Sequence, residues 1–122
     1  MARILIIEDE KILNAAYRLI LEKEGHAVTT AHDGLAGLKL ARSFKPDIIL
    51  LDLLMPVMDG VEFLKAYQPK QKHPHCHIII LSNIDQDTNI QKAYKLGASR
   101  YVLKAVTSPQ QLAVLVNHIV KK

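Results

Sequence analysis

The sequence is short of the residues that mark several classes of protein. It has a single cysteine, Cys76, so it cannot form an internal disulfide, and this fits a reducing compartment. No apolar run is long enough to span a membrane, and the run from Ile4 to Ile7 is too short for the core of a signal peptide. We therefore expect a cytoplasmic protein that does not interact with membranes.

Aromatic residues are also few, at 5% of the chain. The net charge of +4 comes from lysines and arginines scattered from Arg3 to Lys122, without a basic cluster or a stripe of alternating basic and aromatic residues. This pattern indicates no direct nucleic-acid binding. The length of 122 residues and the hydrophobic content of 49% predict one packed domain over residues 1–122.

Five short runs rich in Ile, Leu and Val alternate with segments of helical periodicity. Such alternation is typical of an α/β fold in which helices cover both faces of a parallel sheet. The predicted strands are Ile4 to Glu8, Ala27 to Thr30, Asp47 to Asp52, Ile78 to Ser82 and Tyr101 to Lys104.

Each predicted strand leads into a predicted helix. The first helix has an apolar stripe at helical spacing and stops near Gly25, and the fourth stops at Leu96-Gly97. Asp33-Gly34 and Asp59-Gly60 open the second and third helices. The stripe of the first helix consists of Ile12, Ala16, Leu19 and Ile20.

The start of the last helix is the clearest local signal in the chain. Ser108 is a favourable N-cap, Pro109 follows at the first helical position, and Gln111 is placed to complete a capping box. A helix is therefore expected from this point to the end of the sequence.

Polar residues follow the predicted strands where an open parallel sheet binds its ligands, outside the carboxyl ends of the strands. Three of them are the carboxylates Glu8, Asp9 and Asp52, which would repel one another unless they held a hard cation. Mg²⁺ is the natural candidate, because it binds oxygen ligands and neutralises phosphoryl groups.

Asp52 ends a buried apolar run, so a rigid strand would hold its carboxylate as a nucleophile that forms an acyl phosphate. Lys104 could neutralise a second phosphoryl oxygen, and the hydroxyl of Ser82 could donate a hydrogen bond. Each residue has an ordinary structural explanation when taken alone, but together they predict a phosphoryl-transfer pocket.

With these residues the chain resembles the response-regulator receiver family of two-component signalling. The resemblance is carried by Glu8-Asp9, by Asp52 with the segment from Leu53 to Gly60, by Ser82 and by Lys104, and it covers essentially the whole chain. It implies a flavodoxin-like, doubly wound (βα)5 fold with a parallel sheet in the order 2-1-3-4-5.

The resemblance also implies roles for individual residues. Asp52 would accept a phosphoryl group from a histidine kinase or phosphotransfer protein, in a reaction that the domain itself catalyses without turning over a separate substrate. The metal ligands would be Glu8, Asp9, Asp52 and the backbone carbonyl of Leu54. Ser82 and Tyr101 would be the switch residues, although Tyr101 could simply fill a groove beneath a helix.

The output surface implied by the resemblance combines the fourth helix, the fifth strand and the fifth helix. A downstream effector or an output domain would bind there, and dimerisation on phosphorylation stays open. A regulator separated from a DNA-binding output is equally compatible with the sequence.

Three positions depart from the family pattern. The residue after Lys104 is usually proline with a cis bond, but here it is Ala105, so we predict a trans bond and a shifted loop. Asn83 replaces a small residue and could narrow the approach to Asp52. Leu54 and Ile84 offer no group to orient an attacking water, which predicts slow dephosphorylation unless Asn83 supplies an amide.

Other functions were weighed against this one. A receiver-like interaction module that works without phosphorylation is the main alternative. A phosphohydrolase of the haloacid dehalogenase type would need a second aspartate at position 54, and a flavin-binding module would need a phosphate loop where Glu8 and Asp9 stand. The cluster of His73, His75, Cys76 and His77 could bind Zn²⁺ or Cu²⁺, but a polar loop that leads into the fourth strand is the preferred interpretation.

Overall fold

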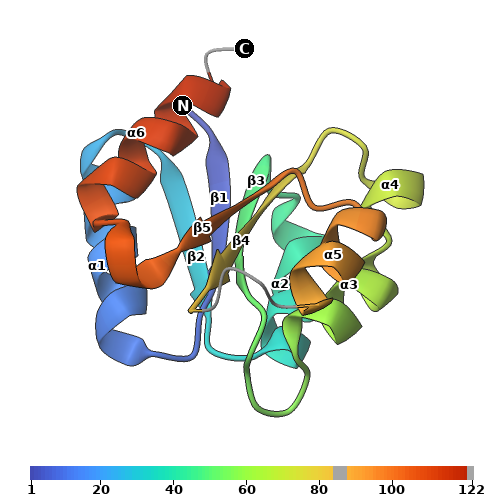
Figure 1. Ribbon diagram of the computed structural model, residues 1–122. Coiled ribbons are helices and arrows are strands. Elements are labelled where there is room, and N and C mark those ends of the chain that lie inside the picture. The colour runs from blue at the N-terminus through green and yellow to red at the C-terminus, as the bar shows by residue number, and fades with distance from the viewer. Residues whose placement is uncertain (84–87, 121–122) are drawn as a thin grey trace.

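The computed structural model describes residues 1–83 and 88–120 of the chain. Five parallel strands form one sheet in the order β2-β1-β3-β4-β5, which confirms the predicted order (Figure 1). Every strand agrees with its prediction to within one residue at each end. The strands are β1 (Arg3–Ile7), β2 (Ala27–Ala31), β3 (Ile48–Asp52), β4 (His77–Ser82) and β5 (Arg100–Leu103).

Helices cover both faces of the sheet, as Figure 1 shows. One face is covered by α1 (Lys11–Lys23) and α6 (Pro109–Val120), and the other by α2 (Gly34–Phe44), α3 (Gly60–Tyr67) and α5 (Thr88–Lys95). A short helix α4 (Pro69–Lys72) and a 3-10 helix η1 (Lys104–Val106) were not predicted. The fourth and fifth predicted helices are therefore α5 and α6. Among the described residues, no helix combines the length and apolarity needed to cross a membrane.

Alternate residues of the central strands contribute their side chains to two separate hydrophobic cores, one on each face of the sheet. On the α2, α3 and α5 side, strand residues pack against helix side chains such as Leu38, Phe63 and Ala93. On the α1 and α6 side they pack against Tyr17 and Val116. Both faces of the sheet are therefore dry, which explains why its strands are almost entirely apolar.

The predicted helix boundaries are confirmed by their hydrogen bonds. Asp33 caps α2 by accepting the Ala36 N–H at 2.8 Å. Asp59 and Glu62 form a reciprocal capping box at the start of α3. Ser108 and Gln111 form another, with hydrogen bonds of 2.8 and 3.1 Å. Gly25 and Gly97 have positive φ angles of 91° and 118°, as expected for residues that follow a helix.

The apolar stripe predicted for the first helix faces the core only in part, through Ile20. Ile12 and Leu19 are 88% and 70% exposed, whereas the buried residues of α1 are Asn14, Tyr17 and Leu21. The helix carries apolar residues on two sides, and the packing against β1 and α6 selects the side with Tyr17. The helical spacing of these residues predicted the helix but not which of its sides is most deeply buried.

Lys104 was predicted to end the fifth strand, but it begins the 3-10 helix η1. The pairing between β4 and β5 ends with Ser82 opposite Leu103, so the next residue is free to turn. No cis peptide bond occurs in the described part of the chain, so the Lys104–Ala105 bond is trans, as predicted.

Candidate functional site

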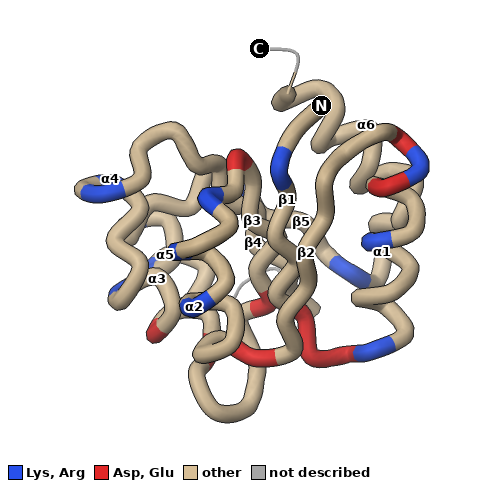
Figure 2. The backbone as a smooth tube through the Cα atoms, turned by 180° about the vertical axis from the view of Figure 1, so that it is seen from behind, with Lys and Arg blue, Asp and Glu red and all other residues tan. Residues whose placement is uncertain are grey.

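The segments that follow β1, β3 and β5 meet at the carboxyl edge of the sheet. Asp52 ends β3, and the Glu8-Asp9 pair follows β1 directly. These two strands are neighbours, with Ile7 beside Leu51, so the residues after them lie side by side. Figure 2 shows acidic segments gathered at this end of the molecule, the lower end in that view.

Asp52 is held in one orientation by the strand and by two hydrogen bonds. The residue is only 4% exposed. Its Oδ1 accepts a hydrogen bond from the Leu54 N–H at 3.1 Å, and its Oδ2 accepts one from Lys104 Nζ, also at 3.1 Å. The Leu54 backbone thus contacts the acceptor directly.

Glu8 is fully buried, yet it carries a carboxylate. Its Oε2 accepts a hydrogen bond from the Glu10 N–H at 3.0 Å. Its Oε1 lies 2.8 Å from Lys104 Nζ, close enough for charge attraction but not aligned for a hydrogen bond, and no other described residue donates to it. Lys104 therefore bridges two acids, and one buried carboxylate oxygen keeps unused acceptor capacity.

Ligand oxygens of Glu8, Asp9 and Asp52 all lie within 4.8 Å of one another. Within the described residues this is the one group of at least three acidic, histidine or cysteine side chains placed to share a metal ion. An all-oxygen donor set with a buried, unsatisfied carboxylate oxygen fits a hard cation such as Mg²⁺.

The protein groups alone create an excess of negative charge at this edge. Burial, the hydrogen bond with Asp9 and the charge of Glu8 together raise the pKa of Asp52 from 3.8 to about 8, against the opposing effect of Lys104. Burial alone would lower the pKa of Lys104, but the Glu8 and Asp52 carboxylates outweigh that effect and raise it. Lys104 therefore stays charged while the acids compete for compensation.

Of the other predicted site residues, Ser82 lies at the same edge of the sheet, whereas Tyr101 lies near the start of its strand, opposite Ile80. Ser82 ends β4 and is buried, one residue beyond the pair formed by Asp52 and Leu81. Asn83 follows it and is exposed. Tyr101 is 38% exposed on β5 and packs edge-to-face against Tyr94, with ring centroids 6.4 Å apart. Ile84 lies outside the described residues.

The histidines before β4 do not converge on a metal site. His73 stacks on Tyr67, with ring centroids 4.0 Å apart and planes at 3°. Burial raises the pKa of the Cys76 thiol to about 12, which keeps it protonated and unreactive. In the described part of the chain these side chains form no metal-binding group, so the interpretation as a polar loop is preferred.

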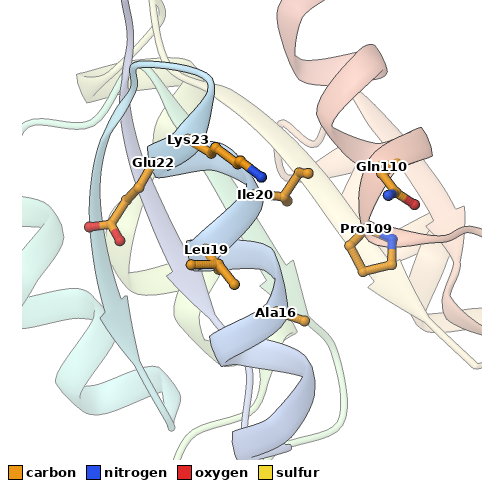
Figure 3. Close-up of a pocket in the computed structure, with 7 residues that line it drawn as sticks. All are labelled: Ala16, Leu19, Ile20, Glu22, Lys23, Pro109 and Gln110. Atoms are coloured by element: carbon orange, nitrogen blue, oxygen red, sulfur yellow. The ribbon is translucent and has the colours of Figure 1, made fainter.

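A hollow of about 620 Å³ lies away from the acidic site, between α1 and the beginning of α6 (Figure 3). Its walls are mainly apolar and include Leu19 and Ile20, with Glu22 and Lys23 at its border. Nothing in it resembles a catalytic group. The lining residues are Ala16, Leu19, Ile20, Glu22, Lys23, Pro109 and Gln110.

Three residues that surround the acidic site were not predicted from the sequence. Glu10 orients Glu8 through its backbone N–H. Asn14 donates a hydrogen bond to the Glu8 carbonyl at 3.0 Å. Tyr17 is buried and is coupled electrostatically to the site. Burial and the charge of Glu8 raise its pKa to about 12. Asn14 had a detectable signal, since it is a polar residue in helical register with Tyr17 and Leu21.

Comparison with known proteins gives a consistent result. A family model for the response regulator receiver domain matches residues 4–117. The chain is 37% identical over 106 residues to the transcriptional regulatory protein AfsQ1 of Streptomyces coelicolor, a match that covers 87% of this chain and 46% of AfsQ1. It is 35% identical over 106 residues to the protein PilH of Pseudomonas aeruginosa, covering 87% of this chain and 88% of PilH.

Solved structures agree with the sequence comparisons. The chemotaxis protein CheY4 of Vibrio cholerae superposes with a TM-score of 0.86 at 28% sequence identity, covering 97% of this chain and 98% of that one. The chain belongs to the response-regulator receiver domain family, as its sequence predicted. It spans about half the length of AfsQ1 and of the related transcriptional regulator CseB.

Membership of this family sets aside two of the alternative functions. Receiver domains are signalling domains that interact with histidine kinases and downstream effectors, and they are generally Mg²⁺-dependent. A phosphohydrolase and a flavin-binding module are therefore no longer competing interpretations.

Proposed function

We propose that residues 1–122 act as one receiver domain, a phosphorylation-controlled switch that accepts a phosphoryl group on Asp52 from a histidine kinase or phosphotransfer protein. One observation carries the proposal. The Lys104 ammonium lies 3.1 Å from Asp52 Oδ2 and 2.8 Å from Glu8 Oε1, beside a cluster of three carboxylates that its single charge only partly compensates. A nucleophile, a cation for the phosphoryl oxygens and a set of metal ligands thus share one edge of the sheet.

The reaction is a transfer of one phosphoryl group. An Asp52 carboxylate oxygen forms a bond to phosphorus, the bond from phosphorus to the donor breaks, and its electron pair leaves with the donor. The product is an acyl phosphate on Asp52. Lys104 is placed to stabilise charge on the phosphoryl oxygens, and the Ser82 hydroxyl would donate to another of them.

Glu8, Asp9 and Asp52 would hold the Mg²⁺ ion together with the Leu54 carbonyl. When bound, the ion supplies charge neutralisation for the phosphoryl group as it is transferred. The chain's own residues do the positioning: the Leu54 N–H orients Asp52, and the Glu10 N–H orients Glu8.

Intact mass after incubation with Mg²⁺ and acetyl phosphate tests this proposal. We expect wild type to gain one phosphoryl group and Asp52→Asn to gain none. Asp33→Asn is a matched control, because this helix cap lies near the same edge and asparagine caps a helix equally well. Wild type without a mass gain would favour the alternative, an interaction module that works without phosphorylation.

The lifetime of the phosphorylated state follows from the exposed Leu54 side chain, which has no polar group to orient water. We expect slow loss of the gained mass once acetyl phosphate is removed, and faster loss in Leu54→Asn. Equal rates for the two proteins would contradict this part of the proposal.

Signal output would use the surface formed by α5, β5 and α6, with Ser82 and Tyr101 as switch residues, and a downstream effector or output domain would bind there. The chain contains no tryptophan, so Tyr101→Trp introduces a single tryptophan, which can be excited selectively. We expect its emission to shift to shorter wavelength on phosphorylation, as the ring becomes buried. A shift of equal size in Leu35→Trp, on α2 outside this surface, would count against a local switch.

A further inference from the structure

One polar side chain of α1 is buried beside the acidic site. Asn14 is only 3% exposed and shares the inward face of α1 with Tyr17 and Leu21. An apolar residue would pack there without needing hydrogen-bond partners, whereas a buried amide is stable only where its polar atoms are paired.

The Asn14 amide donates hydrogen bonds to two backbone carbonyls, both at the carboxyl ends of strands. Its Nδ2 donates to the Glu8 carbonyl at 3.0 Å and to the Ala31 carbonyl at 3.1 Å. The Ala31 carbonyl also accepts the Glu8 N–H at 3.1 Å. Asn14 therefore joins the ends of β1 and β2 at the residue where the acidic segment begins.

We infer that Asn14 is a positioning residue for cation binding, one that acts through the Glu8–Asp9 peptide group. This inference rests on the proposed function. The Glu8 carbonyl belongs to the peptide plane that connects the two acids, so fixing that carbonyl fixes the position of the Asp9 Cα and restricts where the Asp9 side chain can reach. The Glu10 N–H holds the Glu8 carboxylate from the other side, at 3.0 Å.

The same contacts also satisfy two buried carbonyls, which would stabilise any fold. The two roles differ in what they change. A purely stabilising residue alters the unfolding transition alone, whereas a positioning residue also alters metal affinity, because partners that orient metal ligands typically contribute roughly 10- to 100-fold to binding.

Calorimetric titration with MgCl₂ separates the roles in the variants Asn14→Leu and Asn117→Leu. Asn117 is a matched control, because its amide bridges His26 at 2.7 Å and Glu24 at 3.0 Å, near the opposite edge of the sheet. We expect the Mg²⁺ dissociation constant to rise about tenfold in Asn14→Leu and to stay within about twofold of wild type in Asn117→Leu. Similar weakening in both variants, or none in Asn14→Leu, would overturn the inference.

A second measurement does not depend on the metal. Hydrogen exchange of the Glu10 N–H, which bonds to Glu8 Oε2, should be faster in Asn14→Leu than in Asn117→Leu, without added Mg²⁺. Equal exchange in the two variants would contradict positioning. If wild type binds no Mg²⁺ but this difference appears, the proposed function fails while Asn14 still orders the acidic segment.

Asn14→Ser covers the case in which the leucine variant does not fold. It keeps one short donor where the amide offers two, so the dissociation constant should rise by a smaller factor in the same direction. An unchanged constant in a folded Asn14→Ser, together with unchanged Glu10 exchange, would also refute the inference.

Discussion

Asp52 is an ionisable group in a buried position, so the stability of the folded state depends on pH. Burial and neighbouring acids raise its pKa from 3.8 to about 8, so between these values the folded chain binds a proton that the unfolded chain has lost. The contribution of Asp52 to stability is therefore complete below about pH 4 and is lost as the pH rises towards 8. Asp52→Asn removes the cost of burying this charge beside other acids. It should therefore raise the free energy of unfolding at pH 8 by about 2 kcal/mol.

Urea denaturation of both proteins at pH 5 and pH 8, without divalent cations, measures this effect. The advantage of Asp52→Asn should be larger at pH 8. Glu22→Gln changes an acid that is exposed on α1 beside Arg18, and should give a difference that does not grow with pH. An advantage of Asp52→Asn that shrinks between pH 5 and pH 8 would show that the site is compensated in the folded state.

Val57 illustrates strain in the loop that follows the acceptor. Its φ angle is 69°, a left-handed conformation that β-branched residues rarely adopt, and the Met58 N–H donates to the Pro56 carbonyl at 2.7 Å across it. Asparagine tolerates this conformation, so Val57→Asn should raise the free energy of unfolding by about 1 kcal/mol. The same change at Val114, exposed on a regular helix, should give no gain; equal effects at both positions would exclude backbone strain as the cause.

At the scale of elements, α1 presents apolar side chains to solvent on the side of the groove that it forms with α6. Leu19 is 70% exposed and lines this groove, and α1 begins directly after the acidic residues. Exposed apolar stripes on helices commonly bind other proteins. Because this stripe is continuous with the candidate site, we expect the phosphodonor protein to bind it.

Leu19→Asp tests that expectation. Phosphorylation by a histidine kinase that acts on wild type should slow at least about tenfold, since a charge would be placed in the buried interface. Phosphorylation by acetyl phosphate, which needs no protein contact, should be unchanged. Leu35→Asp, on α2 across the sheet, is the control, and equal slowing in both variants would argue against a specific surface.

The predictability of the elements follows from what each one depends on. Strand positions and the caps at Asp33, Asp59 and Ser108 could be predicted because apolar runs and local hydrogen bonds determine them. The inward face of α1 could not, because both sides of that helix carry apolar residues and tertiary packing chooses between them. The short helix α4 was missed because it has no apolar stripe, although Pro69 at its start was a usable signal.

The candidate site was predictable to the level of residues but not of contacts. Glu8, Asp9, Asp52 and Lys104 stand next to strand ends, and the parallel order of the sheet brings them together. The bridging of two acids by Lys104 depends on the turn into η1, and the role of Glu10 depends on a backbone N–H. Neither feature can be predicted from the types of residue at these positions.

At the scale of the whole molecule, metal binding, protonation and folding are linked. Cation binding requires carboxylates that have lost their protons, and the raised pKa of Asp52, about 8, means that a proton must leave this residue at lower pH. Binding to the folded chain alone raises its stability by mass action. The increase in melting temperature caused by 10 mM MgCl₂ should therefore be larger at pH 8 than at pH 6.

Thermal unfolding followed by circular dichroism, with NaCl added to match ionic strength, provides the measurement. Asp52→Asn retains Glu8 and Asp9 but has no proton to lose at position 52, so its Mg²⁺-induced increase should be smaller and should depend less on pH. If MgCl₂ raised the melting temperature of wild type equally at both pH values, proton release from Asp52 would not be coupled to cation binding. The acidic edge would then bind its cation without deprotonating the phosphoacceptor.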